Sequence, residues 1–133
     1  MTTTGTSTTH ASPDLIRRGA TAAVLSVAVN ALVVLATTSS GAVQPVAHLA
    51  YGRVSLFTLA GVVGATLVYG LLRRRRQRPD RDFAIVAAVV LVLSWVPDVT
   101  FIPTVPGATT GGVVVLMALH ATTAGICYGV LTR

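Results

Sequence analysis

The stretch that decides the fold lies between residues 71 and 83 and reads LLRRRRQRPDRDF. Six of the ten Lys and Arg residues of the chain fall within it, whereas residues 54–72 and 83–96 on its flanks carry no charge. Uncharged helices of about 20 residues span a bilayer, and loops rich in arginine stay on the cytoplasmic side of it. The stretch therefore predicts a cytoplasmic turn between two membrane-spanning helices.

The composition of the whole chain agrees with this interpretation. Of 133 residues, 53% are hydrophobic and 11% are charged, and the mean hydropathy is +0.75, whereas about 25% of residues are charged in a typical soluble domain. So short a chain cannot bury this much apolar surface around one core, so most of it must face lipid. The net charge of +6 does not indicate nucleic-acid binding, because no aromatic residue is interleaved with the arginines to stack on bases. The sequence predicts a multi-pass protein of the cell membrane.

Outward from the arginine-rich turn, hydropathy predicts four spans, at residues 19–38, 54–72, 83–97 and 113–131. We expect the third span to end at Pro97, because proline removes a helix hydrogen bond. Residues 1–14 are rich in Thr and Ser and are predicted to form a disordered cytoplasmic tail, which leaves residues 15–133 as a single membrane domain. The fold class is thus all-α, an antiparallel bundle of four transmembrane helices with both termini cytoplasmic.

The first span also has features of a signal peptide. Arg17 and Arg18 precede its apolar run, and a small-residue step follows at Ser40-Gly41-Ala42. Because the run is longer than the roughly 7 to 15 residues of a signal-peptide core, we favour a retained span. The sequence leaves cleavage open as the alternative.

Small residues recur on single faces of the second and fourth spans. Lipid-embedded helices associate through close approach at such residues, so we expect them to pack helices within the chain, with packing against a homo-oligomer or another membrane protein as the alternative. On this view Gly125→Leu disrupts packing, whereas Val115 faces lipid. The helix-packing candidates are Ala60, Gly64, Ala121, Gly125 and Gly129.

The polar residues inside or near the spans are the candidates for ligand or proton handling. Asn30 and His120 lie at similar depth, and because polar groups avoid hydrocarbon we expect their side chains to face each other inside the bundle. Such a pair could simply fix helix register, or His120 could handle protons or a ligand, since imidazole titrates near neutral pH. Asp98 and Arg53 are expected to lie near the outer surface, where they could pair. Together with Ser94, these residues would line an outward-facing polar cleft.

The sequence predicts no catalytic residue, no metal site and no cofactor. It has no His-x-x-His spacing, no paired carboxylates within a span and no activated nucleophile, and Cys127 is the only cysteine. A non-enzymatic protein is therefore favoured over an enzyme. The arginines of the turn are expected to meet anionic lipid headgroups as well as to set topology; they are Arg73, Arg74, Arg75, Arg76, Arg78 and Arg81.

The order and spacing of several residues resemble a family of small four-helix membrane proteins. These are an Asn in the first span, a basic loop ending in proline before a span that begins with phenylalanine, then Ser-x-x-Pro and Leu-Met-Ala-Leu-His. Between Ile16 and Leu131 the chain is similar in this way to the prokaryotic family of unknown function six-zero-six-nine. The matching residues are Asn30, Arg76, Pro79, Phe83, Ser94, Pro97, Leu116, Met117 and His120.

The resemblance implies the four-helix architecture and no particular chemistry. Two functions follow from the sequence. One is a structural or accessory subunit of the membrane. The alternative is a small transporter, channel or ligand-binding bundle that uses the polar cleft around His120.

Overall fold

A computed structural model describes residues 12–43 and 49–133, and the described residues form helices and no β-strand. The α-helices are α1 (Pro13–Ser39), α2 (Tyr51–Arg75), α3 (Pro79–Thr100) and α4 (Thr110–Leu131), and a short 3₁₀ helix η2 (Ile102–Thr104) follows α3. All four α-helices are long and apolar enough to cross a membrane. The chain is therefore a multi-pass, all-helical membrane protein, as the sequence predicts.

The ends of the helices follow from local sequence. Pro13 and Pro79 lie in the first turns of α1 and α3, where a helix needs no backbone donor. The arginine-rich turn suits both of its helices, because Arg73 to Arg75 lie in the last turn of α2 while Asp80 and Asp82 lie in the first turn of α3. Only three residues, Arg76 to Arg78, separate the two helices.

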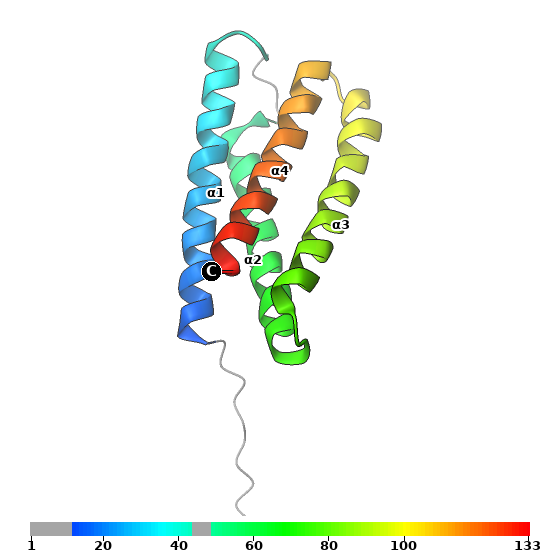
Figure 1. The fold of residues 1–133 in the computed structure, drawn as a ribbon. Coiled ribbons are helices and arrows are strands. Elements are labelled where there is room, and N and C mark those ends of the chain that lie inside the picture. The colour runs from blue at the N-terminus through cyan, green and yellow to red at the C-terminus, as the bar shows by residue number, and fades with distance from the viewer. Residues whose placement is uncertain (1–11, 44–48) are drawn as a thin grey trace, which may run out of the picture.

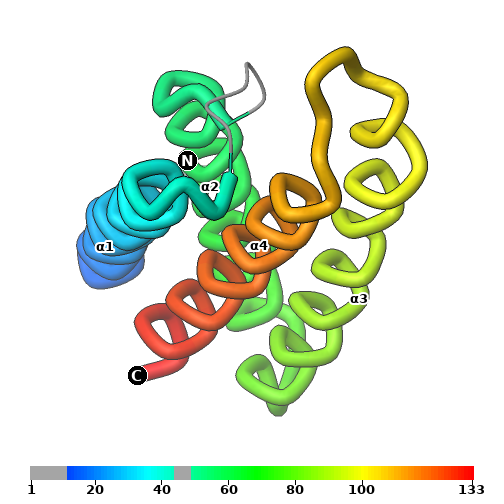
Figure 2. Tube along the Cα trace, turned by 90° about the horizontal axis from the view of Figure 1, so that it is seen from above, coloured from blue at the N-terminus to red at the C-terminus, as the bar shows by residue number. Residues whose placement is uncertain are grey.

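The four helices lie side by side, and successive helices meet at alternate ends of the molecule (Figure 1). Seen from above, α4 lies in the middle, with α1 and α3 on opposite sides of it (Figure 2). Helix α4 packs on α1, α2 and α3, and α1 also packs closely along α2. Helix α1 thus packs mainly on α2 and α4, and α3 packs mainly on α4.

Two apolar clusters fill the interior at the two ends of the bundle. One cluster lies near the arginine-rich turn and the other lies near the opposite end. Between them lie buried polar side chains of α1 and α2 and the half-buried Thr123 of α4. The first cluster is Leu15, Ala22, Val62, Tyr69, Phe83, Cys127 and Leu131, and the second is Val34, Val43, Leu49, Val54, Val115 and Leu119.

The outer surface is covered with large apolar side chains. Val24 and Phe57 are each 70% exposed, and Leu67 is 69% exposed. In water such a surface would be unfavourable, whereas a bilayer solvates it. Val115, which we expect to face lipid, is instead buried in the interior.

The helices extend beyond the predicted spans, and the end of α3 differs from the prediction. Helix α3 does not end at Pro97 but continues through it to Thr100, and the Phe101 N–H donates to the Pro97 carbonyl at 2.9 Å. Proline costs the helix one hydrogen bond, but the last turn persists, and with it Asp98 is buried inside the bundle. Of the predicted tail, residues 1–11 lie outside the described part, and residues 13 and 14 begin α1.

Within the described chain, three of the five small residues expected to pack helices make no close helix contact. A Cβ added at Gly64, Gly125 or Gly129 would meet no atom within 4 Å, and Ala60 is exposed and Ala121 half-buried. The close approach lies elsewhere, because a Cβ at Gly19 of α1 would lie 2.9 Å from the Thr66 side chain of α2. A single sequence shows that small residues line one face of a helix. It does not show whether another helix or lipid covers that face.

Candidate functional site

A layer of polar side chains joins α1, α2 and α4 midway through the bundle. The amide Nδ2 of Asn30 donates to Thr58 Oγ1 and to Thr123 Oγ1, each at 2.9 Å. Asn30 is 1% exposed, and the Thr123 hydroxyl in turn donates to the Leu119 carbonyl. Asn30 Oδ1 and Ser26 Oγ, one turn apart on α1, have no partner among the described residues. Asn30 therefore links three helices by hydrogen bonds in the interior.

A second polar contact joins α3 and α4. His120 Nδ1 lies 2.9 Å from Asp98 Oδ2, and the Asp98 side chain is 7% exposed. One turn away, the indole Nε1 of Trp95 donates to the Met117 carbonyl at 3.1 Å. These two contacts hold α3 against α4. The contact with Asp98 also holds the imidazole of His120 in place.

The expected pairing of Asn30 with His120 is not what the structure shows. Asn30 bonds to the threonines and His120 bonds to Asp98. The two residues are nevertheless close in the network, because Thr123 lies three residues after His120 on α4. Asn30 is buried, whereas the His120 side chain is 38% exposed and lines the cavity, because depth does not determine the direction in which each helix face points.

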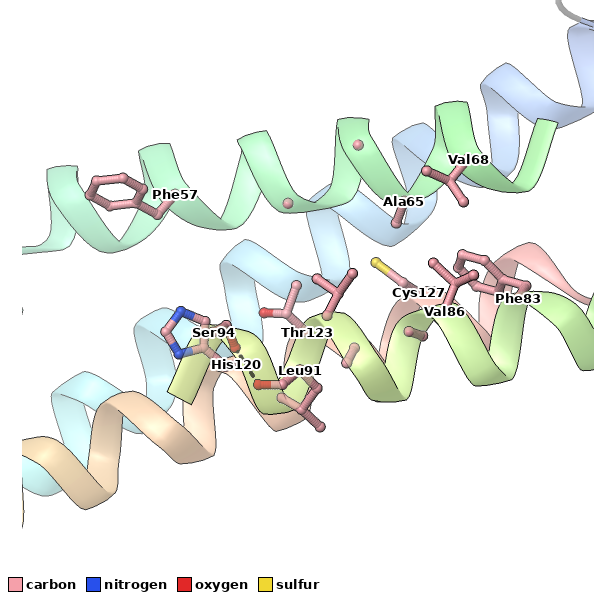
Figure 3. Close-up of a pocket in the computed structure, with 15 residues that line it drawn as sticks. Phe57, Ala65, Val68, Phe83, Val86, Leu91, Ser94, His120, Thr123 and Cys127 are labelled. Atoms are coloured by element: carbon pink, nitrogen blue, oxygen red, sulfur yellow. Dashed lines mark hydrogen bonds between the residues drawn. The ribbon is translucent and has the colours of Figure 1, made fainter. Parts of the chain in front are cut away.

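A cavity of about 440 Å³ opens between α2 and α3, with α4 at its base. Its walls are almost entirely apolar, and the polar side chains that line it are Ser94, His120 and Thr123. Figure 3 shows His120 and Ser94 near one end of the cavity and Val68, Val86 and Phe83 near the other. The cavity is thus a long apolar space with one polar end.

Aromatic rings pack together at the apolar end of the cavity, where Phe83 lines the wall. The Phe83 ring lies 5.1 Å from the Tyr69 ring and 6.5 Å from the Tyr128 ring, measured between centroids. Separations of this size are favourable for aromatic pairs. The Tyr69 hydroxyl donates to Asp80 Oδ1 at 2.6 Å, which ties this end to the arginine-rich turn.

The predicted polar cleft is therefore only partly assembled. Ser94 and His120 line the cavity, while Asp98 holds His120 without lining the cavity itself. Asn30 lies behind Thr123, and Arg53 is exposed. Asp98, which could have paired with Arg53, instead pairs with His120. Gly64, expected at a helix contact, lines the cavity.

Thr58 and Thr123 are the site residues that sequence reasoning missed. Threonine in a membrane helix usually bonds its own preceding turn, as Thr66 does to the Val62 carbonyl, so it gives no strong signal.

Several ion pairs form at and beside the arginine-rich turn, at this end of the bundle. Arg76 lies 3.6 Å from Asp82, and Asp14 at the start of α1 lies 2.8 Å from Arg18 and 4.0 Å from Arg73. Exposed pairs of this kind contribute about 0 to 1 kcal/mol. Their acidic partners offset only part of the positive charge, so the turn remains strongly cationic.

Within residues 12–43 and 49–133, no group of three His, Cys, Asp or Glu side chains gathers closely enough to hold a metal ion. The chemical features of the described residues are thus the His120–Asp98 pair and the cavity between α2 and α3. Four apolar helices with these polar groups inside define a helical multi-pass membrane protein.

The chain belongs to the family of unknown function DUF6069, whose family model matches residues 10–133. This confirms the resemblance seen in the sequence. No curated protein and no solved structure matches the chain.

Proposed function

We propose that the protein is a ligand-binding bundle of the cell membrane that holds a hydrophobic small molecule in the cavity between α2 and α3. The observation that carries this proposal is the cavity itself, with apolar walls and His120 near one end. Its volume of about 440 Å³ falls within the roughly 300 to 1,000 Å³ of small-molecule sites, which are mostly apolar with a few polar groups that orient the ligand.

The cavity is placed for entry from the lipid. Phe57 of α2 and Val90 of α3 line it and are 70% and 57% exposed on the surface that faces hydrocarbon. A molecule dissolved in the bilayer would reach the cavity by passing between these two helices without crossing water. A ligand that partitions into membranes is therefore the fitting class.

The proposed orientation is an antiparallel bundle with both termini in the cytoplasm. The arginine-rich turn supports it, because basic residues close to span ends stay on the cytoplasmic side. The His120–Asp98 pair then lies toward the outer half of the bilayer, and the turn meets anionic lipid headgroups on the inner side.

We propose binding without chemical conversion. Ser94 is the hydroxyl beside His120 in the cavity, yet its hydrogen is donated to the Leu91 carbonyl at 2.7 Å. A nucleophilic serine instead needs its proton directed at a base. The polar end of the cavity is arranged to recognise a ligand.

A structural or accessory subunit is the second candidate, and the open glycines favour it. Gly125 and Gly129 of α4 have free space where a Cβ would be, so a helix of a partner membrane protein or of a second copy could approach closely there. No cavity is needed for that role.

Photo-crosslinking in lipid nanodiscs tests the first candidate. Gly64 lines the cavity, and a Cβ added there meets nothing within 4 Å, so the side chain of Gly64→Leu can extend into the cavity and should fill it without unfolding the protein. We expect Gly64→Leu to lose most labelling by a diazirine-bearing long-chain alcohol.

The matched control is Gly125→Leu, which makes the same change at an open position of α4 that does not line the cavity. It should label like the parent. Equal labelling of the parent and both variants would contradict the cavity as the binding site, and loss of a copurifying protein with Gly125→Leu alone would favour the subunit role.

A further inference from the structure

His120 is held in the cavity wall by a carboxylate that lies behind it. The imidazole lines the cavity, whereas Asp98 is buried at 5% exposure and contacts Nδ1 at 2.9 Å. Asp98 is thus a positioning residue, and the part of the ring left for a ligand is the edge that carries Nε2. The chemistry of the bound molecule depends on what Nε2 offers.

The carboxylate determines where the imidazole proton lies. An ionised carboxylate only accepts hydrogen bonds, so its contact with Nδ1 places the ring proton on that nitrogen. In a neutral imidazole the other nitrogen then carries a lone pair, and an aspartate fixes the histidine tautomer in the same way in catalytic triads. His120 Nε2 therefore presents a hydrogen-bond acceptor.

The neighbouring hydroxyls in the cavity wall also offer acceptors rather than donors. Ser94 donates its hydrogen to the Leu91 carbonyl at 2.7 Å, and Thr123 donates its hydrogen to the Leu119 carbonyl at 2.9 Å. Thr123 additionally accepts from Asn30. Each hydroxyl proton is already used within the chain, so a polar group that enters this end of the cavity meets lone pairs and finds no free donor.

We propose that the cavity selects a neutral amphiphile with a hydroxyl head, such as a long-chain or isoprenoid alcohol or a phenol, which donates to His120 Nε2. This rests on the proposed function and names its ligand class. A carboxylate or phosphate head would bring only acceptors and a negative charge toward Asp98.

The test compares two competitors of the same chain length, of which only one carries a hydroxyl donor. The full chain in nanodiscs is labelled with a diazirine analogue of hexadecanol, in the presence of hexadecanol or of hexadecyl methyl ether. The ether keeps the chain and the oxygen but cannot donate. Since a buried polar group left unpaired loses about one hydrogen bond's worth of binding, we expect hexadecanol to compete at about tenfold lower concentration.

Variants of the pair show whether His120 is the acceptor. The double variant Asp98→Leu with His120→Phe removes both polar groups together, so it leaves no unpaired buried charge, and the two competitors should then act equally. In Asp98→Asn the amide can donate to Nδ1 and move the ring proton to Nε2, so the preference for the alcohol should fall or invert. A merely structural Asp98 would leave the ratio unchanged.

The outcomes separate this inference from the proposed function. If the alcohol and the ether compete equally in the parent, or if the preference persists in the double variant, the hydroxyl assignment is wrong although the cavity binds. If neither competitor reduces labelling, the cavity is not a binding site for amphiphiles, and both proposals fail.

Discussion

Replacing Thr58 should weaken the bundle only while Asn30 is present to bond to it. Thr58 accepts from Asn30 Nδ2 at 2.9 Å and is 7% exposed, so Thr58→Val removes the acceptor while nearly keeping its shape. Interhelical hydrogen bonds in membranes contribute about 0.6 kcal/mol on average and up to about 1.7 kcal/mol. Because a buried amide donor also loses its partner, Thr58→Val alone should cost about 1 to 2 kcal/mol in free energy of unfolding.

The double-mutant cycle with Asn30→Leu isolates this bond. Asn30→Leu loses two hydrogen bonds but also removes the unpartnered Oδ1, so its own cost is a balance of two effects. The coupling between the two changes is the informative quantity, and we expect about 0.6 to 1.7 kcal/mol. Unfolding free energies would be measured by detergent titration or steric trapping in bicelles.

Thr66 provides the control for the cycle. Its hydroxyl donates to the Val62 carbonyl of its own helix at 2.8 Å, so Thr66→Val should show no coupling to Asn30→Leu. If Thr58→Val costs as much in the Asn30→Leu background as in the parent, then the hydrogen bond from α1 to α2 contributes nothing and the reasoning about the polar layer is refuted.

Two further predictions concern topology and packing. In a cysteine-free background, an impermeant maleimide added to intact cells should label Ser40→Cys and Thr109→Cys but not Gln77→Cys, because basic loops stay inside; labelling of Gln77→Cys would reverse the orientation. Gly19→Leu should destabilise the protein by about 1 to 3 kcal/mol, because its Cβ would lie 2.9 Å from Thr66, whereas Gly125→Leu should be neutral or slightly stabilising. Equal thermal stability of the two variants in detergent would contradict this packing.

The architecture could be predicted because it depends on local features of the sequence. The arginine-rich stretch between residues 71 and 83 separates two uncharged runs, and both its cations and its aspartates suit the helix ends they occupy. Hydropathy over about 20 residues determines whether a segment is long enough to span. Neither property requires knowledge of which residues touch.

The packing could be predicted less fully, because contacts depend on the rotation of each helix about its axis. The stripe through Gly125 and Gly129 is regular in sequence, but no neighbouring helix covers it within the described chain. Asn30 and His120 were expected to face each other, yet their partners are Thr58, Thr123 and Asp98. Asp98 itself was expected at the surface and is buried, because α3 continues past Pro97.

Mapping the residues labelled by the diazirine analogue of hexadecanol tests the central claim most directly. After photolysis in nanodiscs, peptide mass spectrometry identifies the attachment sites. The cavity predicts labels concentrated on its walls, at positions such as Ala65, Val86 and Leu91, which competing hexadecanol removes. Labels spread over outward residues such as Val24 and Leu67, unaffected by the competitor, would show that the probe meets the protein only as bulk lipid and would contradict a binding site between α2 and α3.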